Sequence, residues 1–157
     1  MKEQILQILM GALGSLGFSI LFNIHGRKIV IAVAGGALSY ASYLITYHFY
    51  QDPVPGILLA TIVAAILAEI CARLFKAPVI ILLVPMLIPL IPGGDLYYAM
   101  QHFVFNETEA FSEIIQLVIK EMGAIAGGII VVTFLAQLIT KLRNLRSIKN
   151  NDKHSLL

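Results

Sequence analysis

The sequence predicts an all-α integral membrane protein, a bundle of five transmembrane helices whose fourth span is broken by prolines. Its 157 residues are 59% hydrophobic and only 13% charged, whereas soluble domains carry about 25% charged residues. The apolar residues also gather in runs of about 19, close to the length of a helix that crosses a bilayer. These observations exclude a soluble enzyme. The single cysteine, Cys71, excludes a disulfide-stapled secreted domain.

The expected spans occupy most of the chain. They are Ile5–Asn23, Ile29–Tyr47, Val54–Ala72, Pro78–Pro92, and a fifth that starts within Ile114–Met122 and ends near Thr140. We expect residues 1–140 to form a single transmembrane domain and residues 141–157 a basic cytoplasmic tail. The first span has no A-x-A cleavage site after it, so we expect it to be a retained helix and not a signal peptide.

The positions of lysine and arginine predict the orientation. Most of the eleven cations fall in the first loop, the third loop or the tail: Arg27, Lys28, Arg73, Lys76, Lys141, Arg143, Arg146, Lys149 and Lys153. Because cationic connections stay in the cytoplasm, the N-terminus is predicted outside and the C-terminus inside. A four-span arrangement would place the first and third loops opposite the basic tail, so five spans are favoured.

The first span carries a stripe of small and polar residues. Gly11, Ser15, Ser19 and Asn23 recur every four residues. Small residues let helices approach closely in lipid, so helix packing is the favoured interpretation of this stripe. Asn23 differs from the others, because an amide at a helix end can also cap the helix or bind a solute.

The second span has an aromatic face beside a small-residue face. The small stripe is Gly35, Ser39, Ser42 and Thr46, and the tyrosines Tyr40, Tyr43, Tyr47 and Tyr50 share one side of the helix. Tyr47 and Tyr50 are expected in an interfacial belt. Tyr40 and Tyr43 lie deeper, where a phenol needs a partner. They therefore face either a neighbouring helix or a solute pathway, and the sequence leaves both open.

Other polar residues of the spans favour structural roles. Glu69 and Arg73 are four residues apart and can pair. Lys120 and Glu121 are expected at the outer interface, where long side chains reach the headgroups. The G-x-x-x-G motif that begins at Gly123 predicts helix packing.

The proline-rich segment is the strongest functional signal. Pro85, Pro89 and Pro92 each lack an N–H and clash with the preceding turn, so the segment cannot be one regular helix. The carbonyls left unpaired must line protein or water. Broken helices are where many transporters place their substrate site. The structural alternative is a kinked packing helix that ends in a capped re-entrant turn.

A short amphipathic helix is predicted after the break, with Leu96 among the first residues of its apolar face. Asp95 is expected to cap it. The N-terminus of such a helix attracts anions such as a substrate carboxylate. The Asp95 carboxylate would offset part of the positive potential at this helix N-terminus. It could instead bind a substrate ammonium group.

Three motifs carry a resemblance to a known family. They are Gly17-Phe18-x-x-x-Phe22-Asn23-x-x-x-Arg27, then Ala72-Arg73 shortly before Pro78, and Pro89-Leu90-Ile91-Pro92-Gly93-x-x-x-Tyr97-x-x-Met100. Over about residues 10–105 the chain resembles the small subunit of the threonine/serine exporter family. In that family the transporter has two halves, which some members split into a large and a small subunit. The resemblance implies export of threonine and serine, or in some split pairs succinate, across the bacterial cell (inner or plasma) membrane.

The sequence therefore predicts the small subunit of a two-component secondary exporter that works by alternating access. The predicted substrate pathway consists of Asn23, Tyr40, Tyr43, Pro92, Gly93, Asp95 and Tyr97. Expected partners are a large subunit, membrane lipid and a small-molecule substrate (an amino acid or a dicarboxylate), and the Gly/Ser stripes leave a homo-oligomer open. The alternative is a non-transporting membrane scaffold that stabilises a partner transporter subunit.

Catalysis, cofactors and nucleic acid are not expected. The histidines His25, His48, His102 and His154 are scattered and lack a second ligand at helical spacing, so no metal site is predicted. No nucleophile elbow or phosphate-binding loop is present in the sequence. The basic tail is expected to touch anionic lipid and not nucleic acid.

Overall fold

The computed structural model describes the backbone of residues 2–154 and the side chains of residues 2–142. Its elements are α1 (Lys2–Leu21), α2 (Arg27–Tyr50), α3 (Pro53–Leu74), α4 (Val79–Leu87), the short 3-10 helix η1 (Ile88–Leu90), α5 (Gly93–Val104) and α6 (Thr108–His154). The described backbone contains no strand. The predicted all-α class is confirmed.

Four helices are long and apolar enough to cross a membrane: α1, α2, α3 and the Thr108–Leu142 part of α6. The proline-rich segment forms a pair of shorter pieces, Val79–Leu90 and Gly93–Val104, which meet at an angle of 57°. Counting this bent pair as one span makes five. The chain is thus a multi-pass helical bundle with four or five spans.

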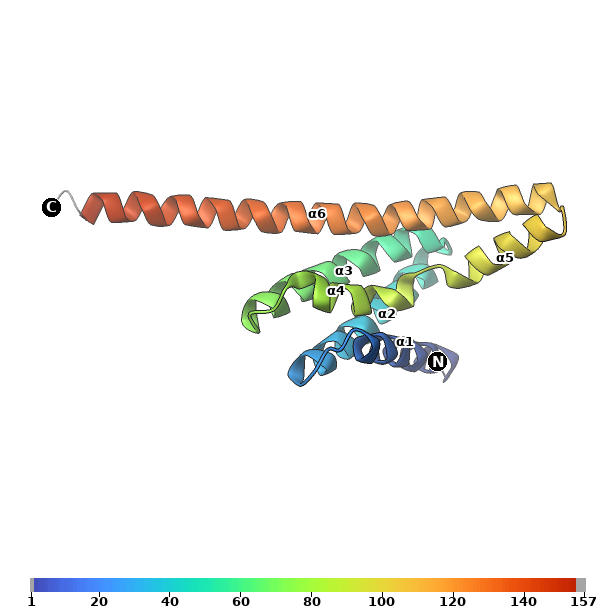
Figure 1. Ribbon diagram of the computed structural model, residues 1–157. Coiled ribbons are helices and arrows are strands. Elements are labelled where there is room, and N and C mark those ends of the chain that lie inside the picture. Colours follow the sequence, from blue (N-terminus) through green and yellow to red (C-terminus); the bar gives the residue numbers. More distant parts are fainter. Residues whose placement is uncertain (1, 155–157) are drawn as a thin grey trace.

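The helices are arranged around α4, which is short but central. It packs against α1, α2 and α3, while η1 continues toward α1 and α2. Helix α6 lies along the outside of the bundle and contacts α3 and α5 (Figure 1). Helix α5 runs back beside the N-terminal part of α6, and α1 lies on the far side of the bundle from α6 (Figure 1).

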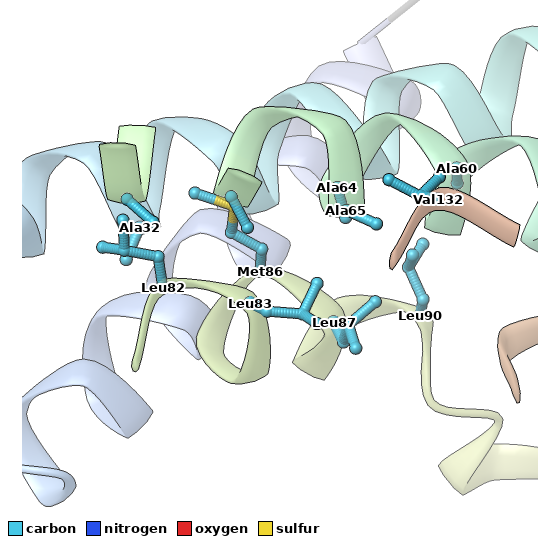
Figure 2. Packing of buried hydrophobic residues seen from close by; sticks show 12 residues of the cluster. Ala32, Ala60, Ala64, Ala65, Leu82, Leu83, Met86, Leu87, Leu90 and Val132 are labelled. Carbon is cyan, nitrogen blue, oxygen red and sulfur yellow. The ribbon is translucent and has the colours of Figure 1, made fainter. Parts of the chain in front are cut away.

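The core is built from small residues on α3 and large ones on α4 (Figure 2). The buried face of α3 is Ala60, Ala64, Ala65, Ala68 and Ala72, and α4 contributes Leu82, Leu83, Met86 and Leu87. Small side chains let helix backbones approach closely in lipid. On the α2 side of α4, Gly35 leaves space for the Met86 side chain, since a Cβ on Gly35 would lie 2.5 Å from Met86 Cε.

The predicted fifth span lies within a longer helix. Helix α6 begins at Thr108, before the predicted start, and continues through residue 140 to His154. Its 47 residues make a helix about 70 Å long, more than the ~30 Å hydrocarbon core requires. No proline interrupts it, and its C-terminal third is rich in leucine, lysine and arginine, which are good helix formers. The side chains of the tail cations from Arg143 onward lie outside the described residues.

The stripe on α1 is a packing face, as predicted. Ser15 and Ser19 are fully buried, and the Ser19 hydroxyl donates to the Ser15 carbonyl at 2.7 Å. Gly36 of α2 lies directly against Ser15, with no room for a Cβ. Gly11 meets Pro89, where a Cβ would lie 3.3 Å from the proline Cβ.

The G-x-x-x-G glycines of α6 do not pack within the described part of the chain, so their role in helix packing stays a prediction. A Cβ on Gly123 or Gly127 would meet no heavy atom within 4 Å. The glycine that packs is Gly128, where a Cβ would lie 2.9 Å from Thr61 Cγ2 of α3. The register of α6 on α3 decides this, because adjacent residues of a helix point about 100° apart.

The predicted pair between Glu69 and Arg73 is confirmed, with Arg73 Nη2 3.3 Å from Glu69 Oε2. The same Nη2 also donates to the Ala136 carbonyl of α6 at 3.3 Å. Arg73 therefore joins α3 to α6 at the end of the bundle opposite the break.

Candidate functional site

The break in the fourth span is a tight turn centred on Pro92. Its φ of −75° and ψ of 62° are those of an inverse γ-turn. The Gly93 N–H closes the turn by donating to the Ile91 carbonyl at 2.7 Å. The proline ring holds φ near the value that the turn needs. Pro85, in contrast, is accommodated inside α4, so the predicted interruption occurs two prolines later.

A cavity of about 150 Å³ lies beside this turn. Its lining comes from five helices and the break itself: Tyr40, Tyr43, Ile57, Pro89, Leu90, Ile91, Pro92, Gly93, Gly94, Asp95 and Glu121. Five of the seven residues predicted for the substrate pathway line it: Tyr40, Tyr43, Pro92, Gly93 and Asp95. The tertiary structure thus brings the deep tyrosines of α2 to the broken span.

Tyr40 and Tyr43 separate this cavity from a second one. Their ring centroids are 5.6 Å apart, and Tyr43 stacks on Tyr47 at 5.8 Å. Both tyrosines also line a cavity of about 420 Å³ toward the end of α2, with Gln4, Gln7, Leu44, Tyr47, His48 and Gln51. The two phenols therefore form a boundary between a small inner chamber and a larger polar one.

Asp95 lies in the first turn of α5 but is not its cap. The N-cap position is occupied by Pro92, and no side chain makes a capping hydrogen bond. The capping prediction is wrong because the helix begins at Gly93, three residues earlier than a cap at Asp95 requires. The half-buried carboxyl lines the cavity instead, beside the first backbone N–H groups of the helix.

Glu121 is the functional candidate that sequence reasoning missed. The sequence predicts it at the outer interface, yet it is 1% exposed and lines the cavity. Its Oε2 atom is buried and has no hydrogen-bond partner among the described residues. It shares the buried face of α6 with Val118, Ala124, Gly128 and Val132. That spacing is visible in the sequence as an acidic residue in register with small and apolar ones, while the neighbouring Lys120 is exposed.

The remaining two predicted residues do not line the cavity. Asn23 is exposed just after α1, with a left-handed φ of 58°, so its local role is to end the helix. Ten residues of α1, about 15 Å, separate Leu21 from Gly11, which lies at the level of the break. Tyr97 is 67% exposed and packs edge-on against Tyr98.

The chemistry of the cavity is acidic and hydroxylic. Two carboxyls, two phenols and the N-terminus of α5 meet there, and none of the lining residues is cationic. The part of the chain with described side chains contains no cluster of three His, Cys, Asp or Glu residues that could hold a metal ion. Such a site can bind and orient a small polar molecule or exchange a proton, but it contains no activated nucleophile.

A helical bundle with a broken span and a polar cavity at the break defines a multi-pass membrane protein of the transporter class. Residues 7–135 match the family model described as "Threonine/Serine exporter, ThrE". The chain belongs to the threonine/serine exporter family, which is a family of transporters and not of enzymes. No solved structure matches the chain.

Proposed function

We propose that this chain is the small subunit of a two-component secondary exporter in the bacterial inner or plasma membrane. It moves threonine, serine or a related small polar metabolite out of the cytoplasm, together with a large subunit. Its N-terminus lies outside and its C-terminus inside, so α6 ends in the cytoplasm. The observation that carries the proposal is the cavity at the Pro92 turn, because it joins a broken span to polar side chains of α2 and α6.

Unpaired backbone is tolerated at membrane depth only where it lines protein or a wet cavity. The break at Pro92 meets this condition, and the cavity that it lines is of the size of one small metabolite. Under alternating access the bent pair α4–α5 would move against α2, with the Tyr40–Tyr43 boundary opening one chamber to the other. The break between the two pieces, which are bent by 57°, would be the hinge of that motion.

The cavity suits an amino acid better than a dicarboxylate. The first N–H groups of α5 offer positive potential to a carboxylate. Asp95 offers negative charge to an ammonium group. A zwitterion satisfies both, whereas the second carboxylate of succinate would lie against the like charge of Asp95. Threonine and serine are therefore the first substrates to test, with succinate as the competing one.

The need for a partner subunit is supported by helix faces that pack against no other helix in the described part of this chain. In the candidate spans of both α1 and α6 only 11% of residues are buried. A Cβ added to Gly17 of α1, or to Gly123 or Gly127 of α6, would meet no heavy atom within 4 Å. Glycines on a membrane helix permit close approach of another helix.

The same open faces favour the second candidate function, a scaffold that only stabilises a transporting partner. The two functions differ in what the cavity does. In an exporter, Tyr40→Phe and Asp95→Asn change the apparent affinity for the substrate. In a scaffold they leave affinity unchanged, and only changes on the open faces affect the yield of the complex.

The first experiment is efflux of preloaded labelled threonine, serine and succinate from cells that express this chain with and without its candidate large subunit. Export that requires both chains supports the split exporter and identifies the substrate. Export by this chain alone would replace it with a self-sufficient carrier. Absence of export for all three solutes in both cultures would favour the scaffold.

The second experiment tests the break. Replacing Pro92-Gly93 by Ala-Ala removes the ring that sets the γ-turn, so we expect export to be abolished at normal expression. Tyr97→Phe is the matched control, because Tyr97 follows the same turn but points away from the cavity. Unchanged export in the Ala-Ala variant would remove the break from the mechanism.

A further inference from the structure

The cavity contains one side chain whose chemistry the proposed pathway does not use. Glu121 is buried to 1% exposure inside a membrane-spanning bundle, and its Oε2 has no donor within reach in the described structure. An ionised carboxylate in that position lacks both water and a counter-ion, which is costly. Ionisable residues inside a membrane bundle commonly mark ion or proton pathways.

The charged group that lines the cavity with Glu121 is also acidic, and none of the lining residues is cationic. Across the cavity are Asp95 of α5 and the phenols Tyr40 and Tyr43 of α2. Helix α3, which packs on α6, contributes the apolar Ile57, and the N-cap of α3 is the acidic Asp52. On α6 itself the adjacent Lys120 is exposed on another face.

We propose that Glu121 is a proton-binding site of the transporter, and that it exchanges its proton through the cavity at the Pro92 turn. Proton binding by Glu121 does not depend on the proposed export function. Only the coupling of this proton to transport rests on that function. The Glu121 carboxylate accepts a proton from water that enters on one side, forming a neutral acid. It returns that proton to water on the other side after the break has moved, so no other reactant is consumed.

The two carboxyls of the cavity differ in burial, and this difference assigns them different roles. Asp95 is half-buried and lies at the N-terminus of α5, so it is placed to meet a solute. Glu121 is closed off on the packed face of α6 against α3. A positively charged solute group beside Asp95 would favour loss of the Glu121 proton, which links solute binding to proton release.

The proton site can be observed without any transport. Infrared spectra of the full-length chain in lipid vesicles would show the C=O stretch of a protonated carboxyl at neutral pH. The band should move on transfer to D₂O and disappear at high pH. Glu121→Gln should remove it, whereas Glu113→Gln should not, because Glu113 is an exposed carboxyl of the same helix. Absence of the band, or its persistence in Glu121→Gln, would overturn the proposal.

The coupling role is tested by comparing two modes of transport in vesicles that contain both subunits. Solute exchange at equal pH needs no net proton movement, whereas uptake or efflux driven by a pH gradient does. Glu121→Gln should reduce gradient-driven transport about tenfold or more and leave exchange within about twofold. Glu121→Asp should restore part of the driven transport.

An equal loss of both modes in Glu121→Gln would make Glu121 a packing residue and overturn the coupling role. Normal driven transport in that variant would do the same. If the unmodified pair exchanges none of the three solutes, the proposed export function fails, and the infrared measurement still decides whether Glu121 binds a proton.

Discussion

Gly56 of α3 lies directly against the ring of Tyr43 in α2, and a Cβ on Gly56 would lie 2.9 Å from Tyr43 Cδ2. Tyr43 borders both the inner cavity and the larger polar one. A residue with no side chain therefore positions the phenol that separates the two chambers. Gly56 begins a stripe of small residues that recurs every four positions along α3 through Ala60 and Ala64. The stripe predicts close packing but does not say which side chain of α2 lies against Gly56.

Gly56→Ala is expected to lower transport by displacing the Tyr43 ring. Overpacking of this kind costs about 1–3 kcal/mol, and the ring can relieve it only by moving into a chamber. We expect efflux to fall several-fold at normal expression, measured with the substrate identified above. Gly14→Ala is the matched control, since its Cβ would lie in ordinary contact, 3.8 Å from Ile88 Cγ2. Equal efflux in the two variants would show that the ring position does not matter.

Gly128→Ala is expected to destabilise the packing of α6 on α3, where the new Cβ would lie 2.9 Å from Thr61 Cγ2. The expected cost is about 1–3 kcal/mol, seen as a lower midpoint of thermal unfolding in detergent. Gly127→Ala adds the same methyl group one residue earlier, on the open side, and should leave the isolated chain unchanged. If Gly127→Ala lowered the unfolding midpoint more than Gly128→Ala, α6 would pack on α3 in a different register.

Leu82→Ala is expected to be among the most damaging single truncations of the core. Leu82 is completely buried between α4 and its neighbours, and truncation of such a leucine costs about 2–5 kcal/mol. Ile80, on the outer face of the same helix, is 61% exposed. Ile80→Ala should change the unfolding midpoint little, and similar losses in both variants would contradict the central position of α4.

Glu69→Gln is expected to have little effect. The pair with Arg73 is long at 3.3 Å, and the arginine side chain is half exposed, so its loss should cost less than about 1 kcal/mol. The Arg73 donor to the Ala136 carbonyl remains in this variant. A loss of several degrees in the unfolding midpoint would assign the pair a larger role than its geometry supports.

Periodicity within single helices predicted much of the candidate site. The spacing of Tyr40 and Tyr43 places them on one deep face, and Pro92 marks the break that they border. Both signals are local, because they depend on residues three or four positions apart or on one proline ring. Asn23 and Tyr97 do not line the cavity, because a position in a motif does not say whether a side chain faces a cavity.

Glu121 shows what a local pattern leaves out. Its neighbour Lys120 and its place near the start of an apolar run favour an interfacial position. The side chain is buried instead because the face with Ala124 and Gly128 packs on α3, and α5 folds back to place Asp95 across the cavity. The capping prediction for Asp95 failed likewise, because the γ-turn at Pro92 moved the start of α5 to Gly93.

The sequence by itself determined that the chain is a helical membrane protein, where its first three spans lie, that the fourth is broken, and that it resembles the exporter family to which it belongs. These follow from composition, run length and proline chemistry, which act along one segment. Only the tertiary structure decided which glycines pack, how far α6 extends, and which residues meet at the break. Those outcomes depend on contacts between helices far apart in the chain, where the fit of small and large side chains selects one register.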